Sequence, residues 1–320
     1  SDPYTGSVNT AMVLAGALGS VRVTKGPVAS VYGANALGGV VEVTTVAHER
    51  TGLGYRIAAG TDGRYSGHVS GGGQLGRFRL VGGVATRGRS DFSLPVSYEG
   101  ETWEDGDLRD YSGDERLFAW GRASWRPGAR TDASVSVQVA DSSWDAPAST
   151  SSDRPRFWSF PYWREVRTTG SFAFRPNDRL SMESTLFYAM NDNDLASYND
   201  PERTDRAWLS SVSNRAFGGY AHAEYRGLER HRVSGGLNVR GDVARLRDDV
   251  GERWEQYEST TASVFAQDEV SISQRDLVSA AVNLDMMSGE GQSLARFSPQ
   301  AAYTRKLGGP FSARVLVGMK

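Results

Sequence analysis

The sequence has no cysteine among its 320 residues. Disulfides, iron–sulfur clusters and structural zinc sites with thiolate ligands are therefore excluded for this chain. The absence fits an oxidising compartment, where a stray thiol is a liability, and it fits a cytosolic protein equally well. The cysteine count alone does not decide the compartment.

Long apolar runs and an excess of one charge are also missing. No segment approaches the roughly 18 consecutive apolar residues of a membrane-spanning helix, and the N-terminus lacks the pattern of a signal peptide. A net charge of −2, with 23% charged residues, gives no indication of a nucleic-acid partner or an acidic tail. The 37 glycines and 10% aromatic residues instead favour strands and turns.

Apolar and polar residues alternate from about residue 52 to the end of the sequence. Val233, Leu237 and Val239, for example, alternate with Ser234 and Asn238. The alternating segments run for roughly 9–15 residues, whereas a soluble strand has about 5–6 and a tilted transmembrane strand about 9–11. We count about thirteen such segments, which together are typical of a transmembrane β-barrel.

Short and longer connections alternate along this region. Short turns are expected near 74–77, 126–129, 175–178, 226–229, 273–276 and 307–310. Longer connections are expected near 88–114, 141–165, 191–211 and 244–256, with shorter ones at 61–64 and 288–294. Because neighbouring strands are antiparallel, all turns lie at one end and all loops at the other, which is the asymmetry of an outer-membrane barrel. A large soluble β-sandwich or propeller is the alternative.

Residues 1–47 break the alternation and predict a small separate piece. We expect a short helix over 9–17, short strands at 21–23 and 40–43, and turns at the glycines between them. The sequence thus divides into 1–47 and 48–320.

A motif in this first piece carries a family resemblance. Lys25-Gly26-Pro27 follows the first short strand, Tyr32-Gly33 comes next, and Gly38-Gly39 opens the second strand. This ordered run resembles the C-terminal half of the plug in TonB-dependent receptors. Lys25 stands where the family usually has Arg, which keeps the charge and loses a bidentate fork. Downstream, residues 263–269 weakly resemble a barrel segment of the same family.

The resemblance implies a mostly β protein: the C-terminal part of a small α+β plug (1–47) and the N-terminal part of an antiparallel transmembrane β-barrel (48–320). Family barrels have about 22 strands, of which about thirteen would lie here. The first half of the plug, its TonB box and the closing strands would then lie outside this sequence. The structural or coupling residues carried over from the plug motif are Lys25, Gly26, Pro27, Tyr32, Gly33, Gly38 and Gly39.

The resemblance also implies a function. It is TonB-dependent uptake of a scarce, bulky nutrient across the bacterial outer membrane, foremost a ferric siderophore, with cobalamin or another chelate as further options. The implied partners are TonB with its inner-membrane energising complex, outer-membrane lipid and lipopolysaccharide, and a small metal chelate. Neither nucleic acid nor a cofactor is expected, and no nucleophile–base arrangement supports an enzyme. A passive porin or an adhesin-type barrel without energy coupling is the alternative.

Two groups of residues are candidate sites. An aromatic–basic group suits an anionic, ring-bearing ligand, although a membrane-interface girdle or loop packing explains such residues too. It comprises Arg154, Arg156, Phe157, Trp158, Phe160, Tyr162 and Trp163. Asp192, Asp194 and Asp200 offer oxygen ligands for calcium, although such residues are also common in turns.

Overall fold

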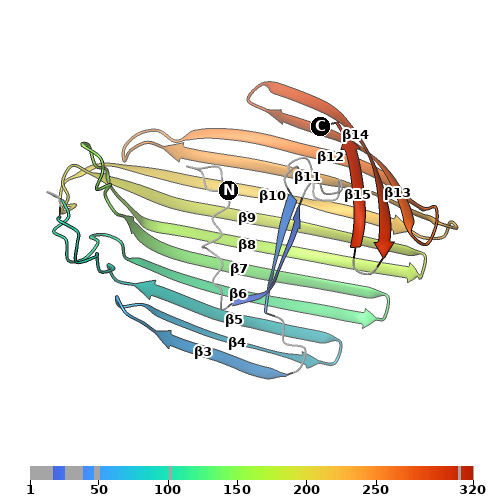
Figure 1. Ribbon diagram of the computed structural model, residues 1–320, viewed down its shortest axis with the longest axis horizontal. Coiled ribbons are helices and arrows are strands. Elements are labelled where there is room, and N and C mark those ends of the chain that lie inside the picture. The colour runs from blue at the N-terminus through green and yellow to red at the C-terminus, as the bar shows by residue number, and fades with distance from the viewer. Residues whose placement is uncertain (1–16, 26–38, 47–50, 101–102, 309–310, 320) are drawn as a thin grey trace.

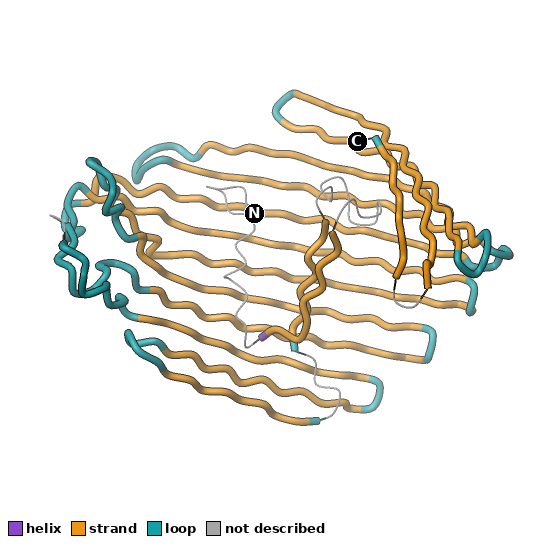
Figure 2. The backbone as a smooth tube through the Cα atoms, in the orientation of Figure 1, coloured by secondary structure: helices purple, strands orange, loops and turns teal. Residues whose placement is uncertain are grey.

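The computed structural model describes residues 17–25, 39–46, 51–100, 103–308 and 311–319, and Figures 1 and 2 show its arrangement. Strands β1 (Leu18–Lys25) and β2 (Gly39–Thr45) pair antiparallel in a sheet of their own, with Lys25 opposite Gly39. The two predicted short strands are therefore confirmed. The predicted helix up to residue 16, and Gly26, Pro27, Tyr32, Gly33 and Gly38 of the motif, lie outside the described residues.

The remaining strands form one antiparallel sheet of thirteen strands in chain order, which confirms the predicted architecture. Strands β3 and β15 are its two edges, so the sheet is curved but not closed (Figure 1). The strands are β3 (Gly52–Ala59), β4 (Tyr65–Leu75), β5 (Phe78–Arg89), β6 (Asp114–Gly128), β7 (Thr131–Ala146), β8 (Phe157–Asn177), β9 (Leu180–Tyr198), β10 (Arg206–Tyr225), β11 (His231–Arg247), β12 (Glu255–Ser271), β13 (Asp276–Gly289), β14 (Gln292–Gly308) and β15 (Phe311–Gly318).

Turns and loops are sorted to opposite ends of the sheet, as the sequence predicts. The loops are shorter than expected, however, because β8, β9 and β10 extend over 21, 19 and 20 residues. Much of the predicted connections at 141–165 and 191–211 is strand. Beyond the apolar region polar and aromatic side chains mix on both faces of these strands, so the alternation disappears from the sequence. The backbone ladder nevertheless continues, with Arg164 opposite Asp192.

The two faces of the sheet have opposite chemistry. One face exposes Leu237 and Val239, which are 48% and 44% accessible. On the other face Ser263, Asn283 and Ser298 are buried. In Figure 1 the hairpin of β1 and β2 is drawn in front of the sheet, and Ala17 beside β1 belongs to one buried cluster with Ala85, Phe118 and Trp120 of this second face. We call the second face inner and the apolar face outer.

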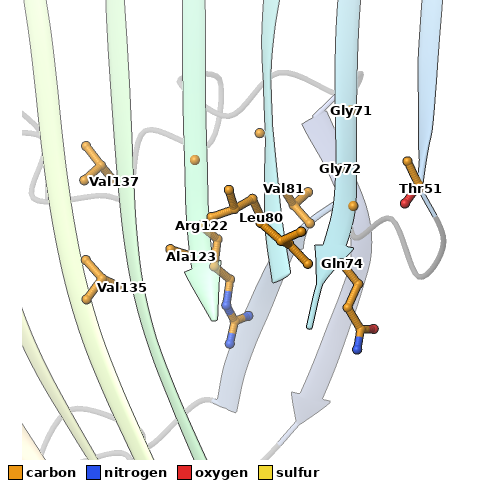
Figure 3. A pocket seen from close by; sticks show the side chains of 14 residues that line it. Thr51, Gly71, Gly72, Gln74, Leu80, Val81, Arg122, Ala123, Val135 and Val137 are labelled. Carbon is orange, nitrogen blue, oxygen red and sulfur yellow. The ribbon is translucent and has the colours of Figure 1, made fainter. Parts of the chain in front are cut away.

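Glycines shape the outer face of β4, β5 and β6. Gly71, Gly82 and Gly121 are register partners in one row across these strands. They form the floor of a shallow groove of about 810 Å³, with Val135 and Val137 of β7 along one side (Figure 3). The groove is apolar and lies within the outer face.

No helix among the described residues is long and apolar enough to cross a membrane.

Candidate functional site

An aromatic cluster lies on the inner face at the loop end of β6, β7 and β8. Phe118 and Trp120 stack with ring centroids 5.7 Å apart. Trp144 stacks on Phe160 at 4.6 Å and meets Trp163 at 5.1 Å. Trp163 is only 1% accessible. Aromatic pairs at such spacings are worth about 0.5–1.5 kcal/mol beyond the area they bury, so these contacts stabilise the loop end of β6, β7 and β8.

A bulge in β8 brings Phe160 and Trp163 to the same face. Ser142 of β7 is opposite Trp163 and Trp144 is opposite Phe160, so three steps along β8 match two steps along β7. Pro161 lies inside the bulge, where the missing N–H costs no ladder hydrogen bond. Without the extra residue, strict alternation would turn one of these two rings to the outer face.

Three arginines surround one carboxylate beside the aromatic cluster. Asp114 accepts ion pairs from Arg87 at 3.2 Å, Arg89 at 2.8 Å and Arg116 at 3.1 Å. The group carries an excess of positive charge. Arg87, Arg89 and Asp114 line a pocket of about 370 Å³ between β3, β4 and β5 that also includes Arg64. This charge favours an anionic ligand.

Two buried donors on the inner face of β6 have no partner among the described residues. They are Nη1 of Arg116 and Nε1 of Trp120, and both atoms are buried. The Arg116 guanidinium also lies 5.6 Å from the ring centroid of Trp144. A buried donor without an acceptor is unfavourable, so an oxygen-bearing ligand that accepts from these atoms would be stabilised.

Two arginines in the loops join three loops above the cluster. Arg203, between β9 and β10, donates to Asp145 at 2.6 Å and to the carbonyl of Ala146 at 3.1 Å. Arg109, between β5 and β6, pairs with Glu104 and donates to the carbonyl of Ala148. These hydrogen bonds and ion pairs connect the three loops at the end of β7.

The predicted aromatic–basic group does not lie in one loop, as the sequence led us to expect. Most of it lies in β8 and not in a loop, and it divides between the two faces. Trp158 contacts Trp208 at 6.3 Å and lies under Arg156 at 4.9 Å, on the face of Phe160 and Trp163. Tyr162 lies on the outer face under Arg164. Phe157 is the first residue of β8, and Arg154 is exposed in the preceding loop. Ligand binding by this group stays a prediction.

The three calcium candidates lie apart. Asp192 pairs with Arg215 at 2.6 Å, and Asp194 lies opposite Tyr162 on the outer face. Asp200 accepts hydrogen bonds from the backbone and hydroxyl of Thr204, which is a turn role.

Among the described residues, the three carboxylates at ligand spacing are instead Glu104, Asp105 and Asp110. Glu104 is already paired with Arg109, and burial together with the charges of Glu104 and Asp105 raises the pKa of Asp110.

Sequence reasoning missed the inner-face residues of β5, β6 and β7. Asp114, Arg116, Phe118 and Trp120 occur at every second position, so they share one face of a strand. That spacing was a usable signal. It was overlooked because charged and aromatic residues mix on this face, and neither kind alone stands out.

The sequence matches no family model and no curated protein. Solved structures do match. The copper transporter OprC is similar over 93% of this chain and 50% of its own, with 16% identity and a TM-score of 0.75. The FrpB iron transporter from Neisseria meningitidis (F3-3 variant) is similar over 92% and 52%, with 12% identity and a TM-score of 0.74. This chain has the fold of the TonB-dependent receptors.

A third match with this receptor fold is the ferric-catecholate import receptor Fiu from E. coli K12. It is 12% identical, with a TM-score of 0.72, over 93% of this chain and 59% of its own. The chain thus spans about half the length of the receptor structures it matches. Thirteen antiparallel strands with sorted connections agree with part of such a barrel.

Proposed function

We propose that this chain is part of an outer-membrane receptor that takes up a bulky metal chelate, foremost a ferric siderophore, in a TonB-driven step. The observation that carries the proposal is the polarity of the two faces, which is the reverse of that in a water-soluble protein. Leu237 and Val239 are exposed on the outer face, and Ser263 and Asn283 are buried on the inner face. A water-soluble sheet would bury the first pair and expose the second. A lipid-facing wall around a polar lumen explains both.

The inner-face cluster supports an anionic, ring-bearing ligand. Trp158 and Trp208 offer aromatic faces, and Arg156 and Arg116 offer guanidinium groups at the loop end of the lumen. Stacking and charge-assisted hydrogen bonds together recognise an aromatic chelate with negative charge. The matching structures are a copper transporter, an iron transporter and a ferric-catecholate import receptor, which supports uptake without naming this chain's ligand.

The hairpin of β1 and β2 belongs to the proposed plug, residues 1–47, and residues 48–320 to the proposed barrel wall. The presence of Ala17 in one buried cluster with Ala85, Phe118 and Trp120 supports this assignment. A ligand at the aromatic cluster would then lie close to the plug. Energy coupling needs an element with two states that the ligand biases, and the plug is our candidate, with TonB as its periplasmic partner.

The test is uptake by the full-length protein in cells with and without TonB. Ferric catecholates, ferric hydroxamates and cobalamin are supplied in turn to a strain that lacks its own receptors. We expect saturable uptake of one class that disappears without TonB. The Trp158→Ala/Arg156→Gln variant should weaken uptake at limiting ligand, and Tyr162→Ala should not. Equal uptake without TonB would contradict the proposal and favour a passive porin.

A further inference from the structure

The outer face changes from apolar to charged between two adjacent register rows. The first row runs across β7–β11 through Val139, Val166, Met190, Arg215 and Val243. The next row toward the loops runs through Asp141, Arg164, Asp192, Ser213 and Arg245. Two residues along a strand cover about 6.6 Å. The apolar band of the outer face therefore ends between these two rows. If the chain spans a membrane, the second row lies at the level of the lipid headgroups.

Most charges at this edge neutralise one another. Arg164 pairs with Asp141 at 2.5 Å, and Arg215 pairs with Asp192 at 2.6 Å. These four side chains form a balanced network across β7–β10. They leave no net charge for a ligand.

The β11 end of the same edge is different. Arg245 and Arg247 both lie at the Trp254 ring, with guanidinium carbons 5.3 Å and 5.1 Å from its centroid. Their register partners, Ser211, Ser213 and Gln256, are uncharged. Within the described part of the chain neither arginine forms an ion pair, and Nε of Arg247 is buried without a hydrogen-bond partner.

Nearby carboxylates accept hydrogen bonds from other groups, although the charge of Asp249 also interacts with Arg247. Asp249 accepts hydrogen bonds from the backbone N–H groups of Leu209 and Val250 at 2.9 Å and 2.7 Å. Glu258 accepts one from Gln256 at 2.6 Å. Nη2 of Arg247 donates to the Ser211 hydroxyl at 3.3 Å. The site thus presents two guanidinium groups at a tryptophan ring, at the border of an apolar face, with no carboxylate of the described residues in an ion pair with either.

We propose that Arg245, Arg247 and Trp254 bind a phosphate group of an outer-leaflet lipid. A guanidinium that stacks on a ring by its face keeps its N–H donors in its own plane, where they can form hydrogen bonds. Two such groups can therefore bind one phosphate. Tryptophan is favoured at the boundary between headgroups and acyl chains, and the adjacent apolar band accommodates the chains. The inference rests on the proposed outer-membrane location and not on the transported ligand.

The test uses the full-length protein, purified in detergent, with binding of bis-phosphorylated lipid A followed by native mass spectrometry. Basic residues at a membrane surface contribute about 1 kcal/mol each, or roughly fivefold per arginine. We expect the Arg245→Gln/Arg247→Gln variant to bind roughly 25-fold more weakly. Arg164→Gln at the balanced network is the matched control and should bind like the wild type.

Three further arms decide the outcome. Lipid A without phosphates should bind wild type and double variant equally, and inorganic phosphate at millimolar concentration should displace little of the lipid. Arg245→Lys/Arg247→Lys keeps the charge and should retain part of the affinity even if the Gln variant folds poorly. Equal binding by wild type and the Gln variant, or equal loss in Arg164→Gln, would overturn the proposal. Chelate uptake should be unchanged in all variants, so failure of the uptake proposal would appear separately.

Discussion

The guanidinium carbon of Arg203 lies 3.8 Å from the ring centroid of Tyr111, so the loop between β9 and β10 rests on the loop between β5 and β6. The Arg203 side chain is 6% accessible and also pairs with Asp145 at the end of β7. Burial lowers the pKa of Arg203 and raises the pKa of Tyr111. Both residues have positive φ angles, 58° and 57°, which only a well-determined contact maintains.

We therefore expect Arg203→Gln to loosen two loops at once. Loss of a buried, charge-assisted pair costs about 2 kcal/mol of local stability. Hydrogen exchange should accelerate in 90–113 and in 199–205, whereas Arg154→Gln, at an exposed position, should change neither. Acceleration confined to 199–205 would show that the loops are independent.

The bulge at Pro161 places nearby aromatic side chains of β8 on different faces of the sheet. Substitutions of these side chains should therefore differ in their effect on ligand affinity. Trp158→Ala removes an inner-face ring that contacts Trp208 and should weaken chelate binding by about 1–2 kcal/mol, or roughly 5- to 30-fold. Tyr162→Ala removes an outer-face ring and should leave the dissociation constant unchanged. Titration of the purified full-length protein by intrinsic fluorescence measures both. The reverse order of effects would contradict the assignment of the two faces.

The stability of the loop between β5 and β6 should depend on pH because of Asp110. Burial, followed by the negative charges of Glu104 and Asp105, raises its pKa above the usual range of aspartate. A carboxyl group with a raised folded-state pKa favours the folded loop when protonated, so the loop should become more stable as pH falls through that pKa. Hydrogen exchange, corrected for intrinsic rates, should show this gain.

Asp110→Asn is the matched variant. It should protect the loop more than the wild type at neutral pH and remove the gain on acidification. Asp249→Asn tests a carboxyl group whose pKa is shifted in the opposite direction. Hydrogen bonds from Leu209 and Val250 hold the pKa of Asp249 below its usual range. There the wild type should lose protection at Leu209 as the pH falls through that lowered pKa. A change of the same sign at both sites would contradict this interpretation.

A charge on the outer face should be far more costly than the same charge on the inner face. Leu186 is 71% accessible and lies between Gly170 and Gly219 in one register row of the outer face. Leu186→Arg should cost about 2–4 kcal/mol of stability in a membrane. Thr185→Arg, one residue away on the inner face, should cost clearly less. Heat-modifiability on gels and urea unfolding in lipid vesicles compare the two.

The sequence predicted strand number, antiparallel order and the sorting of turns and loops, because each depends on local alternation and on turn residues. The two short strands β1 and β2 were predicted for the same reason, whereas their pairing comes from the structure. The loop boundaries were wrong because Asn191, Asp192 and Asn193 continue a ladder whose two faces are both polar, and no local pattern distinguishes that from a loop.

The site was predicted only in part. Trp158, Phe160 and Trp163 come together on the inner face as candidates, but Tyr162 is separated from them by a one-residue bulge that the sequence does not reveal. Asp114 with Arg87, Arg89 and Arg116 depends on the register between β5 and β6, which is a long-range property. Partners set by register between distant residues are not readable from single-sequence patterns.

Single cysteines at Leu237, Asn238 and Val239 test the central claim most directly, because the described chain has no native cysteine. A fluorophore at each position of the full-length protein in lipid vesicles is exposed to a lipid-bound quencher and to a water-soluble one. We predict quenching by lipid at 237 and 239 and by the aqueous quencher at 238. Shielding of 237 and 239 from both quenchers, or equal aqueous access at all three positions, would contradict a lipid-facing wall around a polar lumen.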